Sequence, residues 1–144
     1  MTAERIWIDI PATAAYLHLL SACIADLLDR LPDLNDPEQL TYSVQLAAQE
    51  ISANIVRHAY AESEGRIAVH LAIEPDPTRL VIELHDRGAP FDPSQVPSPD
   101  LDSINVHGYG IFLARALLDE LRYEALPGEN RWRLVKHLNP EAPQ

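Results

Sequence analysis

Five short stretches of this chain alternate apolar and polar residues, and this alternation restricts the folds that the chain can adopt. The stretches are residues 5–10, 66–74, 79–86 and the two arms of 122–138. Alternation over such lengths is typical of half-buried strands. A Pro-Asp-Pro-Thr turn separates the second stretch from the third, and Pro127 and Gly128 separate the last two. The chain is therefore predicted to form one strand followed later by two antiparallel hairpins.

Three other stretches carry apolar residues at helical spacing and predict helices over residues 12–31, about 37–60, and 110–121. The second has a clear start signal, because Asp36 can cap it and Pro37 suits its first position. In the third, the predicted buried side is formed by leucines, at positions 113, 117, 118 and 121. The element order predicts an α+β fold, a two-layer sandwich with a mixed, mostly antiparallel sheet and helices on one face.

The length of 144 residues suits one domain, which we place at residues 1–138, with a disordered tail at 139–144. Eleven basic against 22 acidic residues give a net charge of −11, which disfavours direct binding to nucleic acid or to anionic membranes. We find no apolar run of membrane-spanning length. The lone Cys23 fits a small core side chain in a reducing cytoplasm.

A row of polar residues interrupts the second predicted helix. Glu50, Asn54 and His58 follow one another at intervals of four, with Arg57 beside them, so they share one face. Spacing alone leaves two readings open, since polar side chains in mid-helix usually face solvent. Apolar residues on the other faces favour a row that borders a groove instead.

Two further motifs lie near the long segment 87–110, which is rich in Pro, Ser, Asp and Gly and is predicted to form a mobile lid. The first, "DRGAPFD", places Asp86 at a strand end, where it could accept a hydrogen bond from an amine, and Gly88 would allow a close approach to a flat ring. The second, "GYGIFL", precedes a helix whose free amides could hold phosphate. Taken singly, the first is better explained as an ordinary turn, and the second is equally well explained as an ordinary glycine-rich helix entry.

Together, the three motifs resemble the ATP-binding boxes of the superfamily that joins gyrase, Hsp90, histidine kinases and MutL. The resemblance covers about residues 5–138 and is strongest to the stand-alone anti-sigma factor serine kinases. "NIVRHAY" is similar to the helix end of that family, "DRGAPFDP" to its second box and "RWRLVKHL" to its final strand. It implies a single Bergerat-type ATP-binding domain.

The resemblance also implies a role for each matching residue. Asn54 would be the magnesium ligand, Glu50 the catalytic base, and Asp86 and Gly88 would contact the adenine. Arg57 and His58 would add positive charge near the phosphates. The phosphate loop would comprise Gly108, Tyr109, Gly110, Ile111, Phe112 and Leu113. One departure is the turn "PGENRW", which has a single glycine where many relatives have a Gly-Gly-Thr type turn.

The leading hypothesis is thus a cytoplasmic serine kinase that uses ATP and Mg²⁺ and acts on an anti-sigma antagonist. It would sequester a sigma factor or similar regulator when that antagonist is phosphorylated, and the resemblance suggests a homodimer. The competing hypothesis is a non-catalytic ATP-binding module that acts only by protein–protein binding. The residues leave this choice open, and phosphate transfer would decide it.

Overall fold

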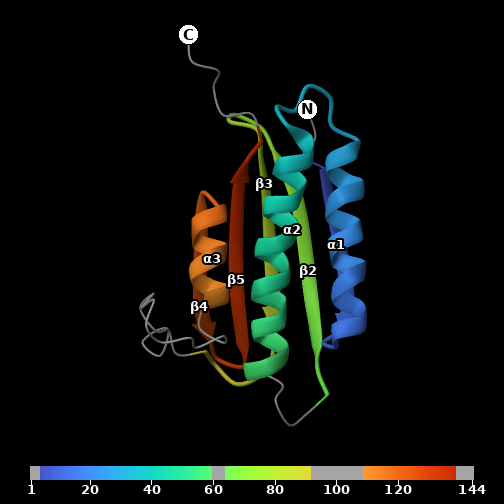
Figure 1. Cartoon of the computed structure of the whole chain (residues 1–144). Coiled ribbons are helices and arrows are strands. Elements are labelled where there is room, and N and C mark those ends of the chain that lie inside the picture. Colours follow the sequence, from blue (N-terminus) through green and yellow to red (C-terminus); the bar gives the residue numbers. More distant parts are fainter. Residues whose placement is uncertain (1–3, 60–63, 92–108, 139–144) are drawn as a thin grey trace.

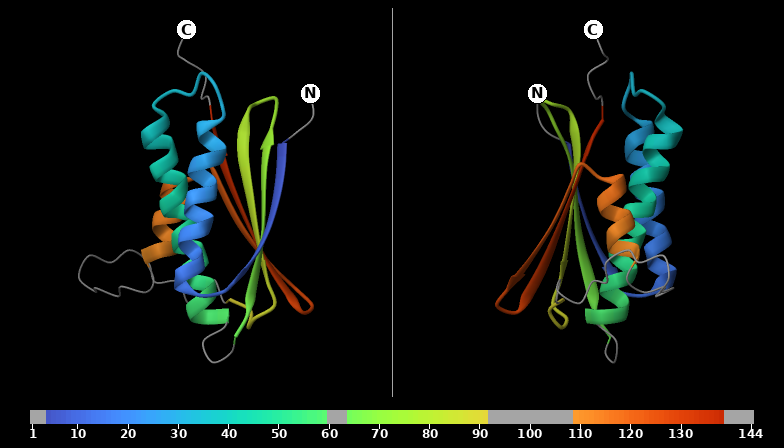
Figure 2. Two further views of the ribbon diagram at one scale, coloured as in Figure 1. Left: turned by 90° about the vertical axis from the view of Figure 1, so that its right-hand side faces the viewer. Right: turned by 60° about the vertical axis from the view of Figure 1, so that its left-hand side comes forward.

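The structure, a computed structural model, describes residues 4–59, 64–91 and 109–138 and arranges them in two layers (Figures 1 and 2). One layer is a five-stranded sheet in the order β1-β2-β3-β5-β4, and every strand pairing in it is antiparallel. The other layer consists of helices, all on one face of the sheet. The predicted two-layer α+β fold is confirmed.

The strands are β1 (Glu4–Pro11), β2 (Arg66–Glu74), β3 (Arg79–Asp86), β4 (Glu120–Leu126) and β5 (Glu129–His137). Their alternation points one set of side chains at the helices. One row across the sheet runs Ile8, Val69, Leu84, Trp132 and Tyr123. The three central members of this row are buried. Because register and burial agree, the sheet has a single inward face.

The helices are α1 (Ala14–Asp29), α2 (Pro37–Asn54) and α3 (Tyr109–Leu117), with a π-helical turn, η1 (Ile55–Ala59), directly after α2. Asp36 caps α2 as predicted, since its Oδ1 accepts the backbone N–H of Gln39 at 3.4 Å. The continuous helix predicted to about residue 60 ends its α-helical part at Asn54. The π-helical turn then alters the spacing of the last polar residues.

The third predicted helix was too long and its buried side was wrong in part. It ends at Leu117, and Leu121 belongs to β4. The side that packs into the core is formed by Ile111 and Ala114, with Leu118 just beyond the helix, whereas Leu113 is only half-buried. A short helix that packs against α2 is oriented by that neighbour, and its leucines alone do not reveal the direction.

No helix in residues 4–59, 64–91 or 109–138 is both long and apolar enough to cross a membrane. Most of the predicted lid, residues 92–108, and the predicted tail, residues 139–144, lie outside the described residues.

Candidate functional site

Asp86 ends β3 on the inward face of the sheet, and its side chain is only 2% exposed. Its Oδ1 accepts two hydrogen bonds, from the backbone N–H of Gly88 and from Nδ2 of Asn130, each at 2.9 Å. Burial raises the pKa of the Asp86 carboxyl above its ordinary value, and these two hydrogen bonds partly offset that effect. The sequence predicted Asp86 at a strand end, and the structure places it there with one oxygen already engaged.

Gly88 lies where the chain passes directly over the end of the helical layer. A Cβ atom at this position would come within 2.4 Å of both the Cβ and the carbonyl oxygen of Ala59. The next residue fixes this contact, because the N–H of Ala89 donates to the carbonyl oxygen of Ala59 at 3.1 Å. Glycine is therefore required for packing between the segment after β3 and the end of η1.

An aromatic cluster, formed by Phe91, Tyr123 and Trp132, packs beside Asp86. The ring centroids of Phe91 and Trp132 are 5.4 Å apart, and those of Tyr123 and Trp132 are 4.6 Å apart. The cluster borders an inner cavity whose walls include Asn54, His58, Asp86, Phe91, Asn130 and Trp132. Its volume is about 10 Å³, which is room for one water molecule. The cavity is too small for a base, so a base could reach Asp86 from this side only if part of the lining, which includes the Phe91 ring, moves.

The polar row on α2 comes close to two of the other motifs. Asn54 is 4% exposed and lines the inner cavity together with Asp86. One turn earlier, the half-buried Glu50 points toward the start of α3, where a Cβ atom at Gly110 would lie 2.5 Å from its Oε2. The first and third motifs therefore meet at Glu50 and Gly110, and the first and second meet at the inner cavity.

Arg57 and His58 both belong to η1 and are exposed. His58 lines the inner cavity, and its ring lies edge-on to Phe91 with centroids 6.3 Å apart. Arg57 lines neither of the two cavities at Asp86. Of the two residues predicted to add positive charge, the structure brings only His58 to Asn54 and Asp86.

The predicted phosphate loop coincides with the first turns of α3, apart from Gly108, which lies outside the described residues. Gly110 and Ile111 are buried, Phe112 is 47% exposed, and Tyr109 and Leu113 are half-buried. The side chain of Ile111 packs in the core. Any contact of Ile111 with a ligand would therefore have to come from its backbone.

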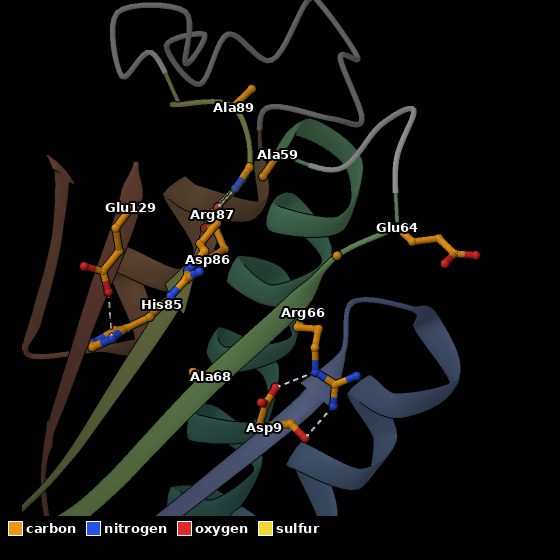
Figure 3. A pocket seen from close by; sticks show the side chains of 12 residues that line it. Asp9, Ala59, Glu64, Arg66, Ala68, His85, Asp86, Arg87, Ala89 and Glu129 are labelled. Carbon is orange, nitrogen blue, oxygen red and sulfur yellow. Dashed lines mark hydrogen bonds and ion pairs between the residues drawn. The ribbon is translucent and has the colours of Figure 1, made fainter. Parts of the chain in front are cut away.

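A second, open depression of about 810 Å³ reaches Asp86 and Gly88 from the other side (Figure 3). An ion pair and a histidine–carboxylate contact lie in it. Arg66 and Asp9 approach to 2.8 Å, and His85 and Glu129 approach to 3.3 Å. Charged side chains of both signs line this depression, with Glu64 and Arg87 in addition to these pairs.

Two residues at this site escaped the sequence reasoning, Asn130 and Tyr123. Asn130 is 4% exposed and faces Asp86 directly in the pairing of β3 with β5. Tyr123 donates its hydroxyl proton to Oδ1 of Asn130 at 2.8 Å. The signal was a polar residue at an inward position of the predicted final strand, within "PGENRW". The strand register, which makes Asn130 the partner of Asp86, is not visible in the sequence.

Comparison with known proteins identifies the class to which this fold and site belong. The family model described as histidine kinase-like ATPase domain matches residues 10–136, nearly the whole chain. The chain therefore belongs to the histidine kinase-like ATPase domain family.

Similar curated proteins narrow this class. The chain is 32% identical over 108 residues to the serine/threonine-protein kinase BtrW of Bordetella bronchiseptica, covering 72% of this chain and 75% of that protein. It is 29% identical over 128 residues to the serine-protein kinase RsbW of Bacillus cereus, covering 83% of this chain and 76% of that protein. These relatives confirm the resemblance to the anti-sigma factor serine kinases and, at the level of the family, the predicted enzyme class of protein serine kinase.

Solved structures support the same fold. A crystal structure of the RsbU and RsbW domains of a Mycobacterium tuberculosis protein matches with a TM-score of 0.68 at 22% identity, over 94% of this chain and 32% of that chain. The histidine kinase domain of a blue-light activated kinase from Erythrobacter litoralis matches with a TM-score of 0.57 at 16% identity, over 87% of this chain and 60% of that chain. This chain thus spans about a third of the first of these and under two thirds of the second.

Proposed function

We propose that this chain is a regulatory protein serine kinase that binds Mg-ATP and phosphorylates a serine on a small anti-sigma antagonist. When the antagonist is phosphorylated, the kinase is free to sequester a sigma factor or a similar regulator. The names of the similar kinases support the serine kinase part of this proposal. The geometry of the chain's own residues supports the use of a nucleotide.

The observation that carries the proposal is the meeting of Asn54 and Asp86 at one cavity, although they come from different layers. Both are polar, and both are more than nine-tenths buried. Burying a polar group has a free-energy cost unless it is paired, and Asp86 pairs only its Oδ1 with donors from residues 4–59, 64–91 and 109–138, which leaves Oδ2 for a ligand. An amine-bearing base at Asp86 and a cation at Asn54 would satisfy both.

The residues present fit a magnesium ion held mainly by phosphate and water. Within residues 4–59, 64–91 and 109–138, no group of three or more His, Cys, Asp or Glu side chains is arranged so that it could hold a metal ion by itself. Mg²⁺ is commonly bound through one or two protein oxygens, with waters and substrate phosphates completing an octahedral shell. We assign the side-chain oxygen of Asn54 to this role. When bound, the ion would neutralise charge that develops on the transferred phosphoryl group.

Glu50 is proposed as the catalytic base. Its carboxylate would accept the proton of the serine hydroxyl while the serine oxygen bonds to the γ-phosphorus of ATP and the bond to the β-phosphate oxygen breaks, releasing ADP. Its position beside Gly110 places the carboxylate at the start of α3. The backbone amides of Gly110 to Leu113, with Gly108 and Tyr109 before them, are assigned to the phosphates. His58 and Arg57 are assigned supporting positive charge.

The test is phosphate transfer from labelled ATP to the cognate antagonist. Glu50→Ala should lower the transfer rate by about 10²- to 10⁴-fold, because the base is lost. Asn54→Ala should lower transfer and weaken the dependence on Mg²⁺. Gln49→Ala is the matched control, since Gln49 is exposed and adjacent on α2. Transfer that survives both Glu50→Ala and Asn54→Ala would refute the mechanism. ATP binding without any transfer would instead favour the non-catalytic regulatory module.

We also propose that the kinase acts in the cytoplasm and forms a homodimer. Five large apolar side chains are exposed in the described part of the chain, and they offer contact surface: Trp7, Tyr16, Leu19, Tyr42 and Phe112. Light scattering at several concentrations would test the dimer. A mass equal to that of one chain at all concentrations would contradict it.

A further inference from the structure

A chain of hydrogen bonds with one fixed direction ends on Asp86. It begins at the backbone N–H of Phe91, which donates to the hydroxyl oxygen of Tyr123 at 2.8 Å. The Tyr123 hydroxyl donates in turn to Oδ1 of Asn130, also at 2.8 Å. Nδ2 of Asn130 then donates to Oδ1 of Asp86 at 2.9 Å. The backbone N–H of Phe91 can only donate, and the orientation of the Asn130 amide determines the direction of the other two hydrogen bonds.

The orientation of the Asn130 amide is determined by a second set of contacts. Besides Asp86, its Nδ2 lies 3.0 Å from the carbonyl oxygen of Gly88 and 3.4 Å from that of Ala89. Carbonyl oxygens accept hydrogen bonds and never donate them, so the opposite orientation of the amide would bring acceptor against acceptor. The amide group of Asn130 therefore presents donors to Asp86 and to the segment after β3.

The consequence for Asp86 is that its two oxygens differ. Oδ1 receives the donors of Gly88 and Asn130, and a proton on this oxygen would collide with both. Oδ2 accepts no hydrogen bond from residues 4–59, 64–91 or 109–138. In those ranges, the fully buried side-chain atoms that lack a hydrogen-bond partner are Nε2 of His70 and Nε2 of His85, and Oδ2 of Asp86 is not among them. Oδ2 is thus the oxygen available to a ligand, and in the ionised carboxylate it can only accept.

We propose that Asn130 and Tyr123 are positioning residues that hold Asp86 as a pure acceptor, and that they thereby select a purine with an amine at C6 over one with a carbonyl. This inference rests on the proposed nucleotide binding at Asp86. An amine at C6 donates to Oδ2, whereas a carbonyl would place two acceptors face to face. A site that leaves a buried polar group unpaired discriminates strongly against the wrong ligand.

The same network controls protonation. Burial raises the pKa of Asp86, and the Asn130 donor opposes this rise. Without the donor, the pKa should rise further, and a proton would settle on Oδ2, which could then donate to a C6 carbonyl. Other titratable or charged groups line the two cavities beside Asp86: His58, Tyr123, Asp9, Glu64, Arg66, His85, Arg87 and Glu129. All of these groups are kept in every variant below, except that Tyr123→Phe removes the Tyr123 hydroxyl. A difference between variants in the pH limit of binding therefore reports on the hydrogen bonds of Tyr123 and Asn130.

The experiment compares ATP with ITP, which carries a carbonyl at C6, by calorimetry on the full chain between pH 5 and 8. Asn130→Leu should weaken ATP binding by about three- to tenfold, the usual effect of one buried hydrogen bond, and lower the preference for ATP over ITP by a similar factor. The acid limit of ATP binding should move to higher pH. Tyr123→Phe keeps the ring that packs on Phe91 and Trp132 and should give a smaller change in the same direction.

Gln49→Ala is the control, because Gln49 is exposed on α2 and lines neither cavity beside Asp86. If Asn130→Leu does not fold, Tyr123→Phe still decides the matter. Unchanged nucleotide preference and unchanged pH limit in the folded variants would overturn the inference while leaving the proposed function intact. If the unmodified chain binds neither nucleotide, both fall together.

Discussion

Replacing Gly110 by alanine tests whether Glu50 must stand where the structure places it. The added Cβ atom would lie 2.5 Å from Oε2 of Glu50, whereas ordinary contacts begin at 3.4 Å. The carboxylate oxygen must therefore retreat by close to 1 Å. It can do so cheaply, because it is the far end of a flexible side chain, and the next nearest atoms of Glu50 are at 3.5 Å.

The expected effect is a loss of rate without a loss of stability. A displacement of about 1 Å in a catalytic group can cost about 10²-fold in rate. Gly110 is the second residue of α3, so alanine should leave the free energy of unfolding unchanged or raise it by up to about 1 kcal/mol. We therefore expect Gly110→Ala to transfer phosphate about a hundredfold more slowly, with an unchanged or slightly higher melting temperature.

A double-mutant cycle with Glu50→Gln separates this cause from others. If the alanine acts by displacing Glu50, it should add almost nothing to the defect of Glu50→Gln. ATP affinity measured by calorimetry in the same variants shows whether the phosphates are also disturbed. Transfer at the normal rate in Gly110→Ala, or two defects that multiply in the double variant, would refute the reasoning.

Three further predictions follow from the site. Gly88→Ala should lower the free energy of unfolding by about 1–3 kcal/mol, because its Cβ would overlap the backbone of Ala59, and urea denaturation would measure this. Asp86→Asn should abolish ATP binding in calorimetry yet stabilise the fold at pH 7. Because the pKa of Asp86 is higher in the folded chain than in the unfolded chain, the unmodified chain gains stability at pH values below the unfolded-state pKa and loses it as the pH rises through the folded-state pKa. The free energies of unfolding of Asp86→Asn and of the unmodified chain, measured in urea, should therefore converge as the pH is lowered. In a Trp7→Phe variant, Trp132 is the only tryptophan, and ATP should change its fluorescence emission as the aromatic cluster opens. An unchanged emission spectrum, with ATP binding demonstrated by calorimetry, would argue against movement of the cluster.

The sequence predicted the strands well because alternation is a local property. The hairpin turns lie where the turn residues place them, and Asp36 caps α2 as its position before Pro37 indicates. It predicted α3 less well, since a row of leucines continues into β4 and periodicity alone does not mark where a helix stops. The π-helical turn after Asn54 also has no simple sequence signal.

The candidate site divides in the same manner. Motif spacing singled out Glu50, Asn54 and Asp86 as chemically unusual, and the fold brings each of them to one of two meeting points, the inner cavity or the contact at Gly110. The roles of these residues stay predictions until transfer and binding are measured. The sequence did not single out Asn130, because its importance depends on which residue of β3 lies opposite to it.

By itself, then, the sequence determined which segments are strands and helices and which polar residues interrupt their apolar pattern. Those properties depend on neighbours within a few positions, where backbone geometry fixes which side chains share a face. The tertiary structure alone decided that Asn130 directs its donors at Asp86 and that Gly110 leaves room for Glu50. Both depend on strand register and helix packing between segments far apart in the chain, because a buried hydrogen bond or a close contact exists only when both partners are brought together.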